Sequence, residues 1–227
     1  MNDMHPHAGD TAPSGAGGST AGRTAGNGSA PPVGELLDLA ARRAVPVVRA
    51  IPGDLLTAPT PCSDYDVRAL LNHLFHVVVQ FRGLAEKQNA DFDLVPDYVA
   101  EGDDWRERFA AATERLVAAW SEPGAEEGTT GTMDMPARTV GCMALLDLTV
   151  HVWDLARATG QEYRIGAAEV PVLRVLDESV TQMGPVARRM GLFAAPVRLP
   201  DGGAGGDGFS RLLAETGRDP LWAPRGT

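Results

Sequence analysis

Apolar residues along this chain recur at steps of three and four, the spacing that places side chains on one face of an α-helix. The pattern predicts six helices, over about residues 33–51, 64–88, 103–121, 138–159, 168–183 and 209–216. Residues 128–136 alternate small and larger side chains around glycines and predict a short strand or hairpin. The pattern therefore predicts an all-α protein: a helical bundle with additional C-terminal helices.

Local signals predict where these helices begin and end. Ser63 and Asp66 have the spacing of a capping box, which predicts that the second helix begins near Asp64. Gly160 is placed to close the fourth helix at the position after its C-cap. Proline predicts a kink at Pro46 in the first helix, and the Gly-Pro pair at 184–185 predicts that the fifth helix is interrupted.

The first 32 residues are almost wholly Gly, Ala, Ser, Thr, Pro and Asn. Such a segment buries too little apolar surface to offset the entropy of ordering it, so we expect a disordered tail over residues 1–32. The remaining residues, 33–227, are expected to form one helical domain. Neither the His5/His7 pair in the tail nor the glycine-rich loop at 201–208 is expected to bind a ligand, since the loop lacks the strand and the Lys-Ser/Thr of a phosphate site.

Charge and composition exclude several classes of function. The formal net charge is −10, a field that disfavours nucleic acid and anionic lipid. The two cysteines, Cys62 and Cys142, have no C-x-x-C spacing, which excludes a disulfide framework and a structural zinc–cysteine site. No uninterrupted apolar run approaches the ~20 residues of a membrane span, and no signal-peptide pattern begins the chain. We therefore expect a cytoplasmic protein without a membrane or nucleic-acid partner, which could form a homodimer through exposed bundle faces.

The fourth helix carries the residues most suggestive of chemistry. It is apolar nearly all round, yet Asp147, His151 and Asp154 stand at steps of four and three on one side of it. Polar groups on a buried helix need partners. They could form a hydrogen-bonded Asp–His pair that braces the core, or lie on an edge of the helix that meets water. They could also ligate a metal ion, for which a third ligand from a neighbouring helix is needed.

The second helix offers two histidines for that third position. Measured around the helix axis, His73 lies roughly 100° and His76 roughly 160° from the centre of the apolar stripe. His73 therefore flanks the core and His76 is predicted to face away from it. The best ligand set is His73, Asp147 and His151, two nitrogens and one carboxylate with an open coordination position, which is typical of catalytic metal sites.

Further residues have less certain roles. Asp154 could orient a ligand histidine, act as a fourth ligand, or instead form a salt bridge with Arg157 or with a residue elsewhere. Cys62 precedes a helix start, which would lower the pKa of its thiol and make it an alternative nucleophile, whereas Cys142 is expected to fill the core. Three aromatic residues could wall a pocket near the ion, although their helical spacing is more typical of core: Phe75, Phe81 and Trp153.

Three segments resemble a known family. Residues 58–73 (APTPCSDYDVRALLNH) and 146–161 (LDLTVHVWDLARATGQ) resemble the metal-binding domain of mycothiol-dependent maleylpyruvate isomerases and their DinB-like relatives. Residues 211–220 (RLLAETGRDP) resemble the ending of a single-domain branch of that superfamily, so the likeness covers about residues 33–220.

The resemblance implies a DinB-like four-helix bundle, here with additional C-terminal helices. In that family the metal is held by a histidine on the second helix and an acid-x-x-x-His pair on a later one, positions that fall on His73, Asp147 and His151. Asp147 stands where the isomerases have glutamate, and its shorter side chain could shift the ion or let Asp154 assist. Zinc is the metal expected first, and nickel, iron or manganese also suit two nitrogens and one oxygen.

The implied activity is metal-assisted chemistry on a mycothiol-type thiol. The isomerases carry a second α+β domain, and too few residues follow Gly160 to build it, so isomerase activity as such is not expected. We expect a metal-dependent thiol transferase or isomerase-like enzyme that takes a small thiol and an electrophilic substrate. The alternatives are a non-catalytic bundle whose metal site is structural or senses a ligand, and a metal-free polar cluster that braces the helices.

Overall fold

The computed structural model describes residues 30–200 and 207–224. Most of the predicted tail, with His5 and His7, and most of the glycine-rich loop lie outside these residues. The helices are α1 (Val33–Arg49), η1 (Gly53–Leu55), α2 (Val67–Ala85), α3 (Trp105–Ser121), α4 (Ala137–Ala158), η2 (Ala167–Glu169), α5 (Val170–Arg189) and α6 (Gly208–Glu215). The predicted hairpin is present as two short antiparallel strands, β1 (Thr129–Thr130) and β2 (Met135–Pro136).

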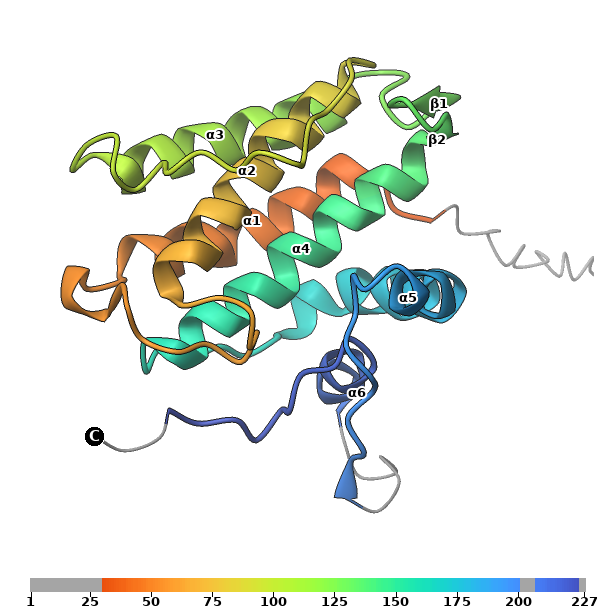
Figure 1. Ribbon diagram of the computed structural model, residues 1–227. Helices are drawn as coiled ribbons and strands as arrows, with labels where there is room; N and C mark the ends of the chain where they lie inside the picture. Colours follow the sequence, from red (N-terminus) through yellow and green to blue (C-terminus); the bar gives the residue numbers. More distant parts are fainter. Residues whose placement is uncertain (1–29, 201–206, 225–227) are drawn as a thin grey trace, which may run out of the picture.

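Four helices enclose the core. α1 packs against α3 and α4, and α2 packs against the same two helices, so that the four close into a bundle (Figure 1). α5 packs on α4, and α6 packs on α5, below the bundle in Figure 1. The largest fully buried side chains come from all four bundle helices and from α5, among them Leu36, Leu70, Trp120, Leu148 and Leu176. The predicted helical bundle with added C-terminal helices is confirmed.

α4 is the central helix of this arrangement. By length and composition it could cross a membrane, but 83% of its most apolar 18-residue stretch is buried inside the protein. Its apolar character is therefore accounted for by contacts with α1, α2 and α5.

The predicted start of α2 is wrong by three residues. Asp66, not Ser63, is the N-cap, and its side chain accepts a hydrogen bond from the backbone N–H of Ala69 at 2.8 Å. The preceding residues cannot join the helix because Pro59 and Asp66 form a β-bridge that closes them into a loop.

The predicted interruption of α5 is also wrong. The helix continues through Gly184 and Pro185 to Arg189. Its buried face includes Val180, Gly184 and Ala187, so the helical spacing of the packed side extends past the proline. Packing on that face outweighs the one backbone hydrogen bond that proline cannot donate.

Two further local signals were Pro46 inside α1 and Gly160 after α4. α1 runs through Pro46 to Arg49 as one helix. Gly160 follows α4 with φ +70°, the left-handed conformation predicted for it, and its N–H donates to the carbonyl of Arg157.

Close approach of α4 to α1 and α3 depends on Gly141. A Cβ at this position would lie 2.7 Å from Val33 Cγ1 and 3.0 Å from the Trp120 ring. Gly141→Ala should therefore overpack the core, although alanine has the better helix propensity. We expect the free energy of unfolding to fall, which denaturant titration would measure.

Gly83→Ala in α2 is the matched control for this substitution. The nearest atom to a Cβ there is the flexible Gln88 side chain at 3.4 Å, so the gain in helix propensity should be retained. We expect the Gly141 variant to be less stable than the Gly83 variant by about 1–3 kcal/mol. Equal free energies of unfolding in the two variants would mean that α4 can move away from α1 and α3 without loss of stability.

An ion pair between the nearly buried Glu169 and the half-exposed Arg43 ties the α4–α5 connection to α1. The Arg43 Nε donates to Glu169 Oε1 at 2.8 Å, and this hydrogen bond holds the pKa of the carboxyl below its usual value of 4.5. A depressed pKa contributes stability that is present above pH 4.5 and is lost as the pH falls through the folded-state value.

Glu169→Gln should accordingly lower the free energy of unfolding at pH 7 by about 1 kcal/mol, because Arg43 stays 40% exposed and is screened. The difference from wild type should shrink as the pH is lowered below 4.5. Denaturant titrations at several pH values would measure it. Asp38→Asn, which breaks the exposed pair with Arg42, should leave stability unchanged, and a pH-independent Glu169 effect would contradict this account.

Candidate metal centre

The three predicted ligands meet where α2 faces α4. One ligand atom each from His73 on α2 and from Asp147 and His151 on α4 lie within 4.8 Å of one another. The His151 Nε2 is 3.8 Å from Asp147 Oδ1, and the His73 and His151 rings lie edge to face with centroids 5.0 Å apart. His151 is buried, and the other two are half-buried, so one side of the cluster is open to solvent.

The protonation of these residues suits a cation. The pKa of His73 is lowered to about 4, mainly by burial and further by electrostatic interactions with His151, His76 and Arg218. His73 is therefore a neutral imidazole near pH 7, the form that ligates a metal. Burial raises the pKa of Asp147, a shift that an adjacent cation would oppose. The donor set thus fits a divalent ion.

The second nitrogen of His151 is held by Asp154. Nδ1 lies 3.1 Å from Asp154 Oδ2, and the carboxylate is fully buried. Since a carboxylate accepts, Nδ1–H donates to it and leaves the Nε2 lone pair facing Asp147. This carboxylate–histidine arrangement is the usual support of a metal-binding histidine. The alternative pairing of Asp154 with Arg157 does not occur, since Arg157 donates to the Trp222 carbonyl.

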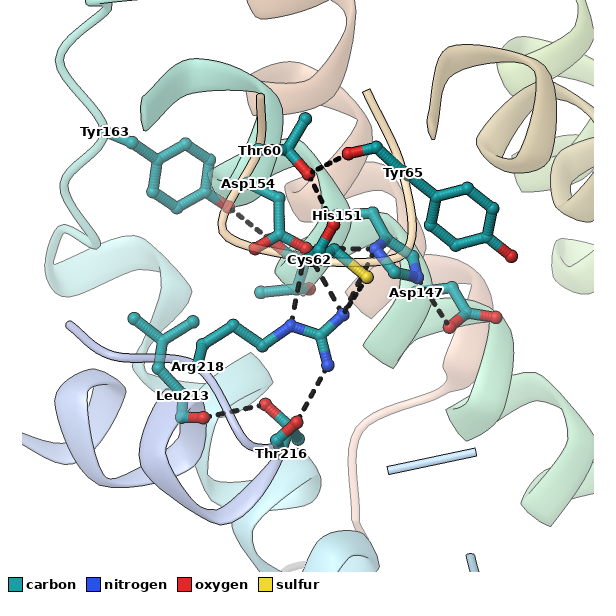
Figure 2. Close-up of polar contacts among 11 residues, drawn as sticks. Thr60, Cys62, Tyr65, Asp147, His151, Asp154, Tyr163, Leu213, Thr216 and Arg218 are labelled. Carbon is teal, nitrogen blue, oxygen red and sulfur yellow. Dashed lines mark hydrogen bonds and ion pairs between the residues drawn. The ribbon is translucent and has the colours of Figure 1, made fainter. Parts of the chain in front are cut away.

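Arg218, which the sequence analysis did not single out, completes this network from the segment after α6. Its Nε and Nη2 lie 3.4 and 3.3 Å from Asp154 Oδ2, and Nη1 donates to the Thr216 carbonyl at 2.8 Å. Figure 2 shows the guanidinium with Asp154, His151 and Cys62 on one side and Thr216 on the other. A buried carboxylate at position 154 signals that a cation is needed, but no spacing identifies one 64 residues away.

Cys62 lies on the arginine side of His151. With His151 and Asp154 it forms a second group of ligand-type atoms within 4.8 Å. A cation there would compete with the Arg218 guanidinium, which is 3.5 Å from Cys62 Sγ, so the group containing His73 is the better site. The predicted lowering of the thiol pKa is wrong: burial raises the pKa of Cys62, and α2 begins five residues later.

A second residue missed by sequence, Tyr65, covers His73. Their rings stack with centroids 5.3 Å apart. The loop that carries Tyr65 is closed around the buried Thr60 hydroxyl, which lies 2.8 Å from the Tyr65 carbonyl oxygen and 2.9 Å from that of Cys62. The same loop therefore places Tyr65 beside one ligand histidine and Cys62 beside the other.

The structure corrects one further prediction. His76 does not face solvent: it is 4% exposed, and its ring nitrogens contact the Tyr98 hydroxyl and the Asp91 carbonyl. The loop between α2 and α3 covers the helix face that the apolar stripe left open. The aromatic residues considered as pocket walls belong to the hydrophobic core: Phe75, Phe81 and Trp153.

A comparison with known proteins matches the part of the chain that contains the candidate ligands. Residues 37–156, which run from α1 to near the end of α4, match the model of the family described as the mycothiol maleylpyruvate isomerase N-terminal domain. No curated protein and no solved structure matched the chain. Because the match covers more than half of the chain and includes all three candidate ligands, the protein belongs to the mycothiol maleylpyruvate isomerase N-terminal domain family, with its DinB-like bundle.

Proposed function

We propose that this protein is a divalent-metal-dependent enzyme that transfers or isomerises a small electrophile with the help of a mycothiol-type thiol. The observation that carries the proposal is the convergence of His73, Asp147 and His151, on neighbouring helices, within 4.8 Å of one another. Membership of a family described by its relation to a mycothiol-dependent isomerase supports the thiol as co-substrate.

The residues have separate tasks in this proposal. His73 and His151 supply neutral nitrogen ligands and Asp147 supplies charge, so a divalent ion keeps a net positive charge of one. When bound, such an ion supplies Lewis acidity, which lowers the pKa of a coordinated thiol and favours its nucleophilic thiolate. Zinc is the first candidate for this ligand set, with nickel, iron and manganese as alternatives.

The partial exposure of the site supports reaction with an external substrate. Asp147 keeps 31% of its side chain exposed, whereas the supporting Asp154 is fully buried. Ligands from solvent can therefore reach the Asp147 side of the cluster but not the Asp154 side. A purely structural zinc site is normally closed by four protein ligands, and only three converge here among the described residues.

Thiol consumption by metal-free and reloaded protein tests the proposal. The chelator-treated protein is divided and loaded with zinc, nickel, iron(II) or manganese, then given mycothiol with a chloro-dinitroarene, a bimane or an unsaturated keto acid. With at least one metal we expect either loss of free thiol, which reports transfer to the electrophile, or isomerisation of the keto acid without net loss of thiol, each above the protein-free rate. Neither should occur with His73→Ala under the same loading.

The two alternatives have distinct outcomes. Equal rates with and without a tightly bound metal would overturn the catalytic proposal and favour a structural or ligand-sensing site. Protein that binds none of the four metals would favour the polar cluster as a brace between α2 and α4.

A further inference from the structure

Asp154 occupies an unusual position for a carboxylate. Its side chain is fully buried in the interior face of α4, and its Oδ1 has no hydrogen-bond partner among residues 30–200 and 207–224. Only Oδ2 is engaged, by His151 and by Arg218. A buried carboxylate without a compensating cation is strongly unfavourable, so Arg218 is the group that allows Asp154 to stay in place as an acceptor.

Two neighbours compete for Nδ1 of His151, and they require different tautomers. Asp154 Oδ2 at 3.1 Å can only accept, which places the proton on Nδ1 and leaves Nε2 with a lone pair. The Arg218 Nη2 at 3.4 Å can only donate, which would place the proton on Nε2 and remove that lone pair. The outcome depends on where the guanidinium directs its N–H groups.

The guanidinium is held so that its N–H groups donate mainly to Asp154. Nε and Nη2 both approach Oδ2, while Nη1 is anchored on the Thr216 carbonyl. Arg218 itself is fixed by its backbone N–H, which donates to the Leu213 carbonyl at the end of α6 at 2.8 Å, after a turn through Gly217 with φ +84°. α6 therefore determines where the guanidinium lies.

We propose that Arg218 is a positioning residue of the metal centre: by holding Asp154 against Nδ1, it keeps Nε2 of His151 free to bind the ion. This inference rests on the proposed function, because it assigns a residue to the same site. Arg218 lies outside the residues that match the family model, 37–156. The C-terminal segment is thus part of the centre and not only a cover over α4 and α5.

The test measures the tautomer of His151 and the zinc affinity separately. Nitrogen-15 NMR of the imidazole in metal-free protein at one fixed pH reports which nitrogen carries the proton. Competition with a chromophoric chelator reports the dissociation constant for zinc. We expect Arg218→Gln to raise the Nε2–H fraction of His151 and to weaken zinc binding about 10- to 100-fold, the usual cost of losing an outer support. Arg218→Lys keeps the positive charge but lacks the paired N–H donors of the guanidinium. Its His151 tautomer and its zinc affinity should therefore lie between those of wild type and Arg218→Gln.

Arg157→Gln is the matched control. Arg157 also ties α4 to the C-terminal segment, but within the described residues its guanidinium donates to the Trp222 carbonyl and not to Asp154 or His151. Arg157→Gln should leave the His151 tautomer unchanged and the zinc affinity within about threefold of wild type, since it removes only the contact with the Trp222 carbonyl. Equal losses in the Arg157 and Arg218 variants would overturn the proposal and assign the effect to general docking of the segment.

Asp154→Ala keeps the test valid if Arg218→Gln does not fold. Alanine removes the acceptor beside Nδ1, so this variant should also raise the Nε2–H fraction of His151, and adding Arg218→Gln to it should weaken zinc binding no further. An unchanged tautomer in folded Arg218→Gln, or additive losses in the double variant, would overturn the proposal. If wild type binds none of zinc, nickel, iron(II) and manganese, the proposed function fails, while the tautomer measurement still decides the role of Arg218.

Discussion

His151→Ala is expected to abolish stoichiometric metal binding, with an affinity loss of about 100-fold or more. His151 is the ligand nearest the centre of the cluster: Nε2 faces Asp147, its ring meets that of His73, and Nδ1 is held by Asp154. Removing it leaves two ligands on different helices, and each ligand of a tight site accounts for several kcal/mol of binding. His73→Ala should have the same effect. Elemental analysis of gently purified, untagged protein measures the metal content.

The control is His76→Ala, one turn from His73 on the same helix. His76 is at least as buried as His151, and both of its ring nitrogens have partners. His76→Ala should therefore lower the free energy of unfolding about as much as His151→Ala does. It should nevertheless keep its metal, since its ring belongs to the contact between α2 and the following loop. Stoichiometric metal in His151→Ala, or an equal loss in His76→Ala, would show that the ligands have been misassigned.

Zinc should raise the midpoint of thermal unfolding of wild-type protein by about 5–10 °C. An ion at 100 times its dissociation constant stabilises the folded state by about 2.7 kcal/mol when it binds only that state. For a chain of this size 1 kcal/mol corresponds to a shift of about 2–4 °C. The effect arises because the site joins α2 and α4, whose contact must break on unfolding. Differential scanning calorimetry with zinc and with chelator measures it.

The same experiment separates ligation from bracing. His73→Ala should unfold at a midpoint that neither zinc nor chelator changes. If the polar cluster only braces the helices, wild type should be equally insensitive, and His151→Ala should lower the midpoint without altering that insensitivity. An increase of the same size in wild type and in His73→Ala would indicate binding elsewhere on this acidic protein.

Much of the bundle was predictable because its evidence is local. Helical periodicity depends on a single face meeting a core, and the helices of the bundle appear close to their predicted ranges. Errors arose where a distant contact changed the local preference. Pro185 stays inside α5 because the packed face continues to Ala187, and α2 begins at Val67 because Pro59 pairs with Asp66.

The candidate site also shows which features local spacing can predict and which it cannot. Asp147 and His151 were identifiable because four residues along a helix place two side chains on one side of it. His73 was identifiable because its angle from the apolar stripe put it at the boundary of the core. The same angle misplaced His76, since it measures the distance from one stripe and takes no account of the loop that covers the opposite face with Asp91 and Tyr98.

The sequence by itself determined the helices, the candidate ligands and the two helix faces from which they project, since these depend on residues within a few turns of one another. Tertiary structure alone decided that α2 and α4 are neighbours, that Tyr65 stacks on His73, and that Arg218 reaches Asp154. Those contacts join residues far apart in the chain, and only the packing of the whole core selects them among the many pairings that charge and hydrophobicity would allow.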